Sequence, residues 1–198
     1  MALELSDVQN IFITHLHEDH MNGIQQLAYY HQIVSKKKPN LYVPESILDD
    51  LWNVIKIGLD RNKYLNDYFD VFPLYEHDSF YIEGQNFKPI KTNHVSYLDS
   101  YGLLAKNQFY FSGDSNVDKT FLTKINDEVK TIFHDCHLWD LYISSHASLE
   151  DIKALPEEIK EKIVLMHYHD GYSGEGIKQV FENREKLLLA RQLQTFEF

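Results

Sequence analysis

The sequence predicts a single α+β domain, and three observations lead to this prediction. Strand and helix patterns alternate up to residue 59, short strand-like pieces fill residues 79–112, and strands and helices alternate again from residue 131. At 198 residues the chain is long enough to bury a two-layer core but short for two domains. We therefore expect one domain over residues 1–198, with the sheets inside and the helices outside.

The N-terminal part predicts the order strand, helix, strand, helix. Residues 8–13 form an apolar run typical of a buried strand, and residues 41–43 form a shorter one. Residues 23–34 and 46–59 carry apolar side chains at helical spacing. This alternation favours strands that are covered by helices on one face.

The middle of the chain predicts an antiparallel meander. Its strand-like pieces are separated by the turn residues Gly84-Gln85 and Lys106-Asn107. We expect strands at residues 80–82, 87–91, 101–105 and 109–111.

The C-terminal part returns to a mixture of strands and helices. Ser148, followed three residues later by Asp151, forms a capping pattern that begins a helix ending near Pro156. We expect strands at residues 131–133 and 162–166, a helix at residues 177–189 and a last strand at residues 194–198.

Composition narrows the partners and the location. The formal net charge of −11 opposes the capture of a large nucleic acid, which normally needs a basic surface. The single cysteine, Cys136, cannot form an internal disulfide, which fits a reducing cytoplasm. No apolar run is long enough to span a bilayer. We expect a cytoplasmic protein that binds a small molecule and no membrane.

The strongest chemical signal is the run from His15 to His20. It places His15, His17, Asp19 and His20 within six residues, directly after a predicted strand. Imidazole nitrogen and carboxylate oxygen are ligands that zinc and similar divalent ions prefer, and such crowding is costly without a cation. The alternative is a solvated polar loop, which the residues downstream make much less favourable.

Three further residues complete a candidate metal site. His94, Asp114 and His167 each follow a predicted strand. Taken singly, the histidines would more often be hydrogen-bonded core or surface residues, and Asp114 would more often belong to a turn. His169 lies on the same face of an extended segment as His167, so periodicity cannot choose between them.

In this order, the seven residues resemble the metallo-β-lactamase superfamily, and the resemblance covers essentially the whole chain. It implies an αβ/βα sandwich with two divalent metal ions, zinc before manganese. One ion would take the equivalents of His15, His17 and His94, and the other those of Asp19, His20 and His167. The equivalent of Asp114 would bridge the two ions. His167 is preferred to His169 because the resemblance aligns Leu-x-His-Tyr.

Other segments narrow the resemblance to one branch. An aspartate at position 114, where β-lactamases mostly carry cysteine, is typical of phosphodiesterases, nucleases and glyoxalases. The segments Phe133-His134-Asp135-Cys136 and Ser145-His146-Ala147-Ser148 resemble those of tRNase Z-like phosphodiesterases. In the segment from His146 to Tyr168, and in lacking an inserted tRNA-binding arm, the chain most resembles the anti-Pycsar cyclic nucleotide phosphodiesterases. The resemblance implies that His146 is a catalytic proton donor or phosphate contact, and a residue at the start of a helix with no chemical role is the alternative. Asp19 is the second candidate catalytic residue.

The prediction is therefore a dinuclear-metal phosphodiesterase that hydrolyses a phosphodiester bond of a small cyclic nucleotide. The first alternative is a tRNase Z-like endonuclease acting at RNA 3′ ends. The second is a truncated, inactive protein that binds metal or a nucleotide.

The pattern departs from the superfamily at the start of the chain. Members normally have about fifty residues of β-hairpin before the first histidine motif, which here arrives at residue 15. We therefore expect an incomplete sandwich that lacks the N-terminal hairpin strands. The exposed sheet edge would need cover, for example from a second copy in a homodimer.

Some residues near the motifs keep two interpretations. His134, Asp135 and His137 are either partners that orient the ligands or ordinary polar residues at a strand end. Four tyrosines either stack on a base or pack in the core, namely Tyr97, Tyr101, Tyr168 and Tyr172. We expect His31 and His77 to lie on the surface.

Overall fold

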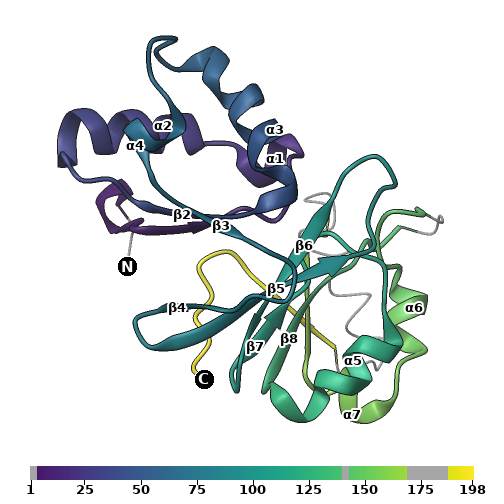
Figure 1. Cartoon of the computed structure of the whole chain (residues 1–198). Helices are drawn as coiled ribbons and strands as arrows, with labels where there is room; N and C mark the ends of the chain where they lie inside the picture. The colour runs from purple at the N-terminus through teal and green to yellow at the C-terminus, as the bar shows by residue number, and fades with distance from the viewer. Residues whose placement is uncertain (1–3, 140–142, 169–186) are drawn as a thin grey trace.

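In a computed structural model, which describes residues 4–139, 143–168 and 187–198, two β-sheets lie between outer layers of helices (Figure 1). Its strands are β1(Asn10–Phe12), β2(Asn40–Pro44), β3(Asp70–Leu74), β4(Phe80–Ile82), β5(Gln85–Thr92), β6(Ser100–Ala105), β7(Phe109–Phe111), β8(Thr131–Asp135), β9(Ile163–Met166) and β10(Leu188–Leu189). Its α-helices are α1(Glu18–Met21), α2(Ile24–Tyr30), α3(Glu45–Ile55), α4(Leu65–Tyr68), α5(Lys119–Ile125), α6(Leu149–Lys153) and α7(Glu157–Lys160). Among these helices none has the length and apolar character needed to cross a membrane.

The first sheet is parallel and has the strand order β1-β2-β3. Parallel neighbours need crossover connections, and α2 and α3 provide them on one face of the sheet. α3 turns Ile47, Leu51 and Ile55 toward that face, where all three are buried in one apolar cluster with Leu41 and Val43 of β2. We call this the N-terminal cluster. Within the described residues, no strand pairs with the outer edge of β1.

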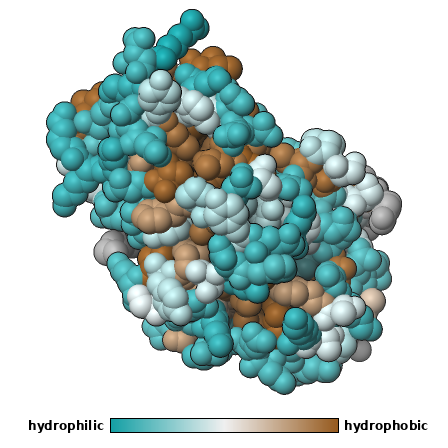
Figure 2. Space-filling view, in the orientation of Figure 1, coloured by the Kyte–Doolittle hydropathy of each residue, from teal (hydrophilic) through white to brown (hydrophobic). Residues whose placement is uncertain are grey.

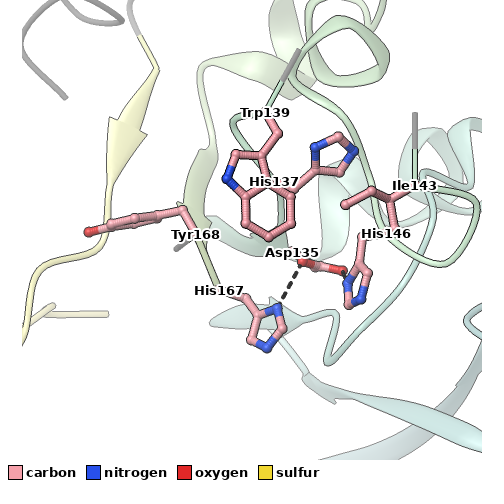
Figure 3. A pocket seen from close by; sticks show the side chains of 7 residues that line it. All are labelled: Asp135, His137, Trp139, Ile143, His146, His167 and Tyr168. Carbon is pink, nitrogen blue, oxygen red and sulfur yellow. Dashed lines mark hydrogen bonds and ion pairs between the residues drawn. The ribbon is translucent and has the colours of Figure 1, made fainter. Parts of the chain in front are cut away.

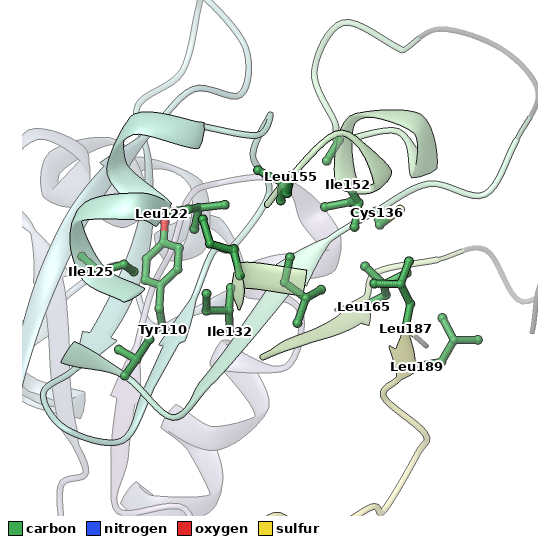
Figure 4. Close-up of a cluster of buried hydrophobic side chains, with 14 of the residues drawn as sticks. Tyr110, Leu122, Ile125, Ile132, Cys136, Ile152, Leu155, Leu165, Leu187 and Leu189 are labelled. Atoms are coloured by element: carbon green, nitrogen blue, oxygen red, sulfur yellow. The ribbon is translucent and has the colours of Figure 1, made fainter. Parts of the chain in front are cut away.

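The second sheet has the order β10-β9-β8-β7-β6-β5-β4. The meander from β4 to β7 is antiparallel, and β7 to β10 are parallel, with α5, α6 and α7 as crossovers. A separate apolar cluster, the C-terminal cluster, lies between these helices and the sheet (Figure 4). Ile132 and Leu165 from the sheet and Ile152 from α6 are fully buried in it.

Aromatic rings join the inner faces of the two sheets. Tyr42 of β2 stacks on Phe80 of β4 with the ring centroids 4.6 Å apart. The C-terminal tail adds to this layer, because Phe196 contacts Phe133 at 4.9 Å and Phe198 contacts Phe109 at 5.1 Å between ring centroids.

The outer surface of the molecule, on the face that Figure 2 shows, is largely hydrophilic. Apolar residues on this face show mainly over the N-terminal elements.

The structure confirms most of the predicted elements. The meander is present, β1 and β2 lie within or around the expected ranges, and the expected helix at residues 46–59 is α3 with a 3₁₀ turn at Lys56–Gly58. The capping pattern is also present, since the Ser148 hydroxyl accepts from the Asp151 amide at the start of α6. The α+β class is therefore correct, and the first sheet has three strands among the described residues.

Three expectations were wrong or incomplete. Residues 194–198 form no strand, because their phenylalanines pack on the face of the second sheet and do not pair at its edge. The helix expected at residues 177–189 falls largely outside the described residues, and its last two residues form β10 beside β9. β3 and α5 were not anticipated, since the short apolar runs at these positions lack a clear period.

His31 also corrects an expectation, because it is fully buried and not on the surface. Its Nε2 lies 3.1 Å from the Val8 carbonyl oxygen and its Nδ1 lies 2.8 Å from the Ser35 hydroxyl. Its two hydrogen-bonding nitrogens are thus satisfied, as burial requires. His77 is exposed, as expected.

Replacing Leu51 by alanine tests the packing of α3. Leu51 is fully buried, so Leu51→Ala removes a core side chain and we expect a loss of about 2–5 kcal/mol in the free energy of unfolding. Val54→Ala, on the exposed side of the same helix, should change it by less than about 0.5 kcal/mol. Urea denaturation measures both, and equal losses would contradict the described orientation of α3.

Candidate metal centre

The topology brings the candidate ligands to one edge of the molecule. β5, β7, β8 and β9 run in the same direction, so their carboxyl ends meet at one edge of the second sheet. The loop after β1 joins this edge, because the Tyr101 amide at the start of β6 donates to the Thr14 carbonyl oxygen over 3.0 Å. The segments that follow these strands hold all seven predicted ligands, of which Asp19 and His20 lie in the short helix α1.

The first group of side chains comprises His15, His17, His94 and Asp114, whose possible ligand atoms lie within 4.8 Å of one another. The His94 Nε2 lies 3.1 Å from the His17 Nδ1 and 3.6 Å from the Asp114 Oδ2. The His15 Nε2 also lies 3.6 Å from that Oδ2. The His94 ring is oriented from behind, because its Nδ1 lies 2.7 Å from the Ser145 carbonyl oxygen.

The second group comprises Asp19, His20 and His167 and faces the other carboxylate oxygen of Asp114. The His20 Nε2 lies 3.0 Å from the Asp114 Oδ1 and 3.4 Å from the His167 Nε2. The Asp19 Oδ2 lies 3.2 Å from the His167 Nε2. The two oxygens of Asp114 therefore point to different groups.

These distances suit ligands that share a cation. Two atoms that each lie about 2.1 Å from a tetrahedral ion are about 3.4 Å apart, close to the separations in both groups. The Nε2 of His15 is buried and has no hydrogen-bond partner among the described residues. An unpartnered buried nitrogen is costly, and a bound cation would satisfy it. By this test the residues fit a divalent metal ion.

The backbone at Asp114 is held tightly. Its carbonyl oxygen accepts hydrogen bonds from the hydroxyls of Thr92 and Ser100. The preceding Gly113 has φ +58°, and a Cβ there would lie 2.8 Å from the Tyr101 carbonyl oxygen. Only glycine fits this position without strain, so the turn places the Asp114 carboxylate reproducibly.

Electrostatics distinguishes the histidines. Burial and the neighbouring His20 lower the pKa of His15 to about 3, so this ring is neutral and can donate a lone pair. Hydrogen bonding to Asp135 raises the pKa of His167 to about 9 in the absence of a metal ion. Burial acts to raise the pKa of Asp114, but the hydrogen bond from His20 and the charge of His167 outweigh it and keep the carboxylate ionised.

Asp135 links two of the histidines and was only half anticipated. Its buried carboxylate accepts from the His146 Nδ1 over 2.7 Å and lies 3.3 Å from the His167 Nδ1 (Figure 3). The Ser115 amide donates to it as well, over 3.1 Å. Sequence reasoning left its role open, because a single aspartate at a strand end carries no signal of what it contacts.

The backbone of His167 is also unusual. It has φ +60°, a conformation uncommon outside glycine and often found at functional sites.

The other residues with two interpretations are now placed. Tyr101 is buried with its hydroxyl 2.9 Å from that of Ser46, and the Tyr168 hydroxyl donates to the Ala190 carbonyl oxygen, so both pack. Tyr97 is exposed, and its hydroxyl lies 3.3 Å from the His17 Nε2. The His134 Nδ1 bonds to the Asp135 carbonyl oxygen, away from both groups. His169 and Tyr172 lie outside the described residues.

Known structures identify the fold. The metallo-β-lactamase fold protein YhfI from Bacillus subtilis superposes with a TM-score of 0.74 at 11% sequence identity, covering 98% of this chain and 79% of that protein. The short form of human tRNase Z superposes with a TM-score of 0.65 at 19% identity, covering 98% of this chain and 81% of that one. The chain therefore has the metallo-β-lactamase fold, with the two groups of candidate metal ligands at one edge of its second sheet.

Sequence relatives define the family. The family model for the anti-Pycsar protein Apyc1 matches residues 1–196, so the chain belongs to this family. An anti-Pycsar protein Apyc1 of Paenibacillus harenae is 32% identical over 175 residues, which are 86% of this chain and 72% of the relative. One from Bacillus phage vB_BsuM-Goe3 is 33% identical over 189 residues, with the same coverage of 86% and 72%.

Proton release on zinc binding tests the position of His167. With its pKa raised to about 9, the metal-free ring is protonated at neutral pH, and a ligand must be neutral. We expect His167→Ala to release about one proton fewer than the unmodified chain when zinc is added at pH 7. Calorimetric titration in buffers of different ionisation enthalpy measures this number. The exposed His77→Ala serves as control and should release as many protons as the unmodified chain, and equal release by His167→Ala would argue against a ligand role.

Proposed function

We propose that the chain is a dinuclear-metal phosphodiesterase and that its substrates are small cyclic nucleotides. The observation that carries the proposal is the position of Asp114, whose Oδ2 lies 3.6 Å from both His15 and His94 while its Oδ1 lies 3.0 Å from His20. A carboxylate placed between two groups of ligands suits two adjacent ions. His15, His17 and His94 would hold one ion, and Asp19, His20 and His167 the other, with Asp114 shared.

Zinc is the favoured ion, because five of the six unshared ligands are imidazoles, namely those of His15, His17, His20, His94 and His167. Manganese is the next choice. Two bound ions would supply an activated nucleophile and neutralise charge on the phosphoryl oxygens. Asp19 is a ligand in this proposal and lies at the open side of the site, with 64% of its side chain exposed.

His146 is the proposed proton donor to the leaving oxygen. The hydrogen bond to Asp135 raises its pKa, since the carboxylate stabilises the imidazolium form. Because its Nδ1 is bonded to Asp135, its Nε2–H is the group free to act on a substrate. Asp135 is then a positioning residue, which orients His146 and stabilises its imidazolium form.

Charge favours a small substrate over a large one. A transfer RNA must be held through many phosphate contacts, and a chain with 19 basic residues and a net charge of −11 offers few of them. A cyclic mononucleotide needs a cationic centre for one phosphate and a small pocket for the rest of the molecule. A local cationic centre outweighs the net charge at short range.

A side-by-side kinetic comparison tests the proposal. For zinc-loaded protein at physiological salt we expect kcat/KM for 3′,5′-cyclic nucleotides to exceed that for a tRNA with a 3′ trailer. Asp114→Ala should abolish turnover, since it removes the shared carboxylate. Efficient trailer removal with inert cyclic nucleotides would favour the RNA-processing alternative, and no turnover of either substrate would favour the inactive, ligand-binding alternative.

Loss of His146 should separate chemistry from metal binding. We expect His146→Ala to retain about two ions per chain and to lose about 10²–10⁴-fold in kcat, which is typical for removal of a general acid. Elemental analysis of the same preparation gives the metal content. Simultaneous loss of metal and activity would show that His146 is a ligand or a structural residue instead.

A further inference from the structure

We infer that a pocket formed by Trp139 and His137, beside the metal centre, holds the base of the nucleotide. This inference rests on the proposed function and names the part of the site that recognises the organic half of the substrate. The pocket has a volume of about 330 Å³ and also includes His146 and His167 in its wall (Figure 3). It is therefore continuous with the ligand groups, on the side where the proposed proton donor stands.

The position of the pocket determines which part of a substrate can reach it. His146 would protonate the leaving oxygen, which is a sugar oxygen in a cyclic nucleotide. With the phosphate at the ligand groups, the sugar passes His146 and the base lies beyond it. The pocket is near the lower end of the size range of small-molecule sites, which suits one base and part of a sugar.

Trp139 supplies a flat apolar surface at this place. Its side chain is 40% exposed, and its ring centroid lies 6.3 Å from that of His137. Ile143 adds an apolar wall next to it. Stacking of a base on an aromatic side chain improves affinity about five- to 100-fold and accepts any base, because every base has a π-face.

His137 supplies the polar contact. It is only 6% exposed, yet neither of its ring nitrogens makes a hydrogen bond of good geometry within the part of the chain that the structure describes. The residue is fixed in place, because its amide donates to the Ala147 carbonyl oxygen over 2.9 Å. A buried imidazole at the wall of a pocket, whose interaction with the Trp139 backbone engages one ring nitrogen at most, leaves the other nitrogen for a ligand.

The charge state of His137 suits a neutral base. Burial lowers its pKa, and the opposing effect of Asp135 does not cancel this. A neutral imidazole has one N–H donor and one acceptor nitrogen. The edges of nucleotide bases also carry both hydrogen-bond donors and acceptors. The His137 ring can therefore pair with either a purine or a pyrimidine.

Tryptophan fluorescence tests the inference directly, because the chain has only two tryptophans, Trp52 and Trp139. Trp52 packs against the N-terminal cluster on α3, so in Trp52→Phe the remaining emission reports on the pocket. We expect adenosine 5′-monophosphate to quench the zinc-loaded Trp52→Phe protein saturably, and ribose 5-phosphate, which lacks the base, to leave its emission unchanged. Trp139→Phe, which keeps Trp52, should show no quenching. Quenching of Trp52 alone, or equal effects of both ligands, would overturn the inference.

Variants of the pocket give a second, independent measurement. By calorimetry, we expect Trp139→Leu to weaken adenosine 5′-monophosphate binding about five- to 100-fold and Trp139→Phe to weaken it much less. Ribose 5-phosphate should bind the unmodified protein and both variants equally. His137→Leu should weaken the nucleotide about tenfold. Unchanged nucleotide affinity in both Trp139→Leu and His137→Leu would refute the subsite.

Hydrolysis of bis(p-nitrophenyl) phosphate keeps the two proposals apart. Turnover of this diester that is lost in Asp114→Ala, together with no base-dependent quenching, would refute the base pocket and leave the phosphodiesterase in place. Base-dependent quenching without any turnover would support the pocket and refute the hydrolytic function.

Discussion

The buried carboxylate of Asp114 is the constraint on which the rest of the site depends. With 2% of the residue exposed, it lies within 4 Å of five imidazole rings. Rings so close together repel one another when protonated, and their lone pairs repel when neutral. A central anion relieves the first problem and a bound cation the second. The fold therefore places an ionised group where few proteins tolerate one, and Gly113 and the two hydroxyls that bind the Asp114 carbonyl oxygen hold it there.

Sequence reasoning was strongest where residue type and order were both informative. The spacing from His15 to His20 and the later positions of His94, Asp114 and His167 were sufficient to name the ligands that the structure brings into adjoining groups. Their roles as ligands stay a prediction until a metal is measured. The fold followed from the same order and from the hydrophobic periodicity of α3 and the meander.

What sequence could not predict depends on contacts between distant segments. Asp135 joins His146 to His167, which are 21 residues apart in the chain, and no local pattern reports that contact. The tail near Phe196 has strand-like alternation but packs on a sheet face, since that face offers aromatic partners. His31 shows the same limit, because its burial arises from contacts with Val8 and Ser35.

The two apolar clusters have a consequence for how the protein holds together. One is built from residues between Ile13 and Phe69 and the other from residues between Leu104 and Leu189, so each is continuous in sequence. Such units can open separately, with their own local stabilities. His15, His17, Asp19 and His20 come from the first stretch, and the remaining ligands follow strands of the second sheet, so ions bound in common would couple the two units. The free energy of separating the two units would then rise with free metal concentration, by about 2.7 kcal/mol at 100 times the dissociation constant. Proteolysis of the chain between them should slow accordingly.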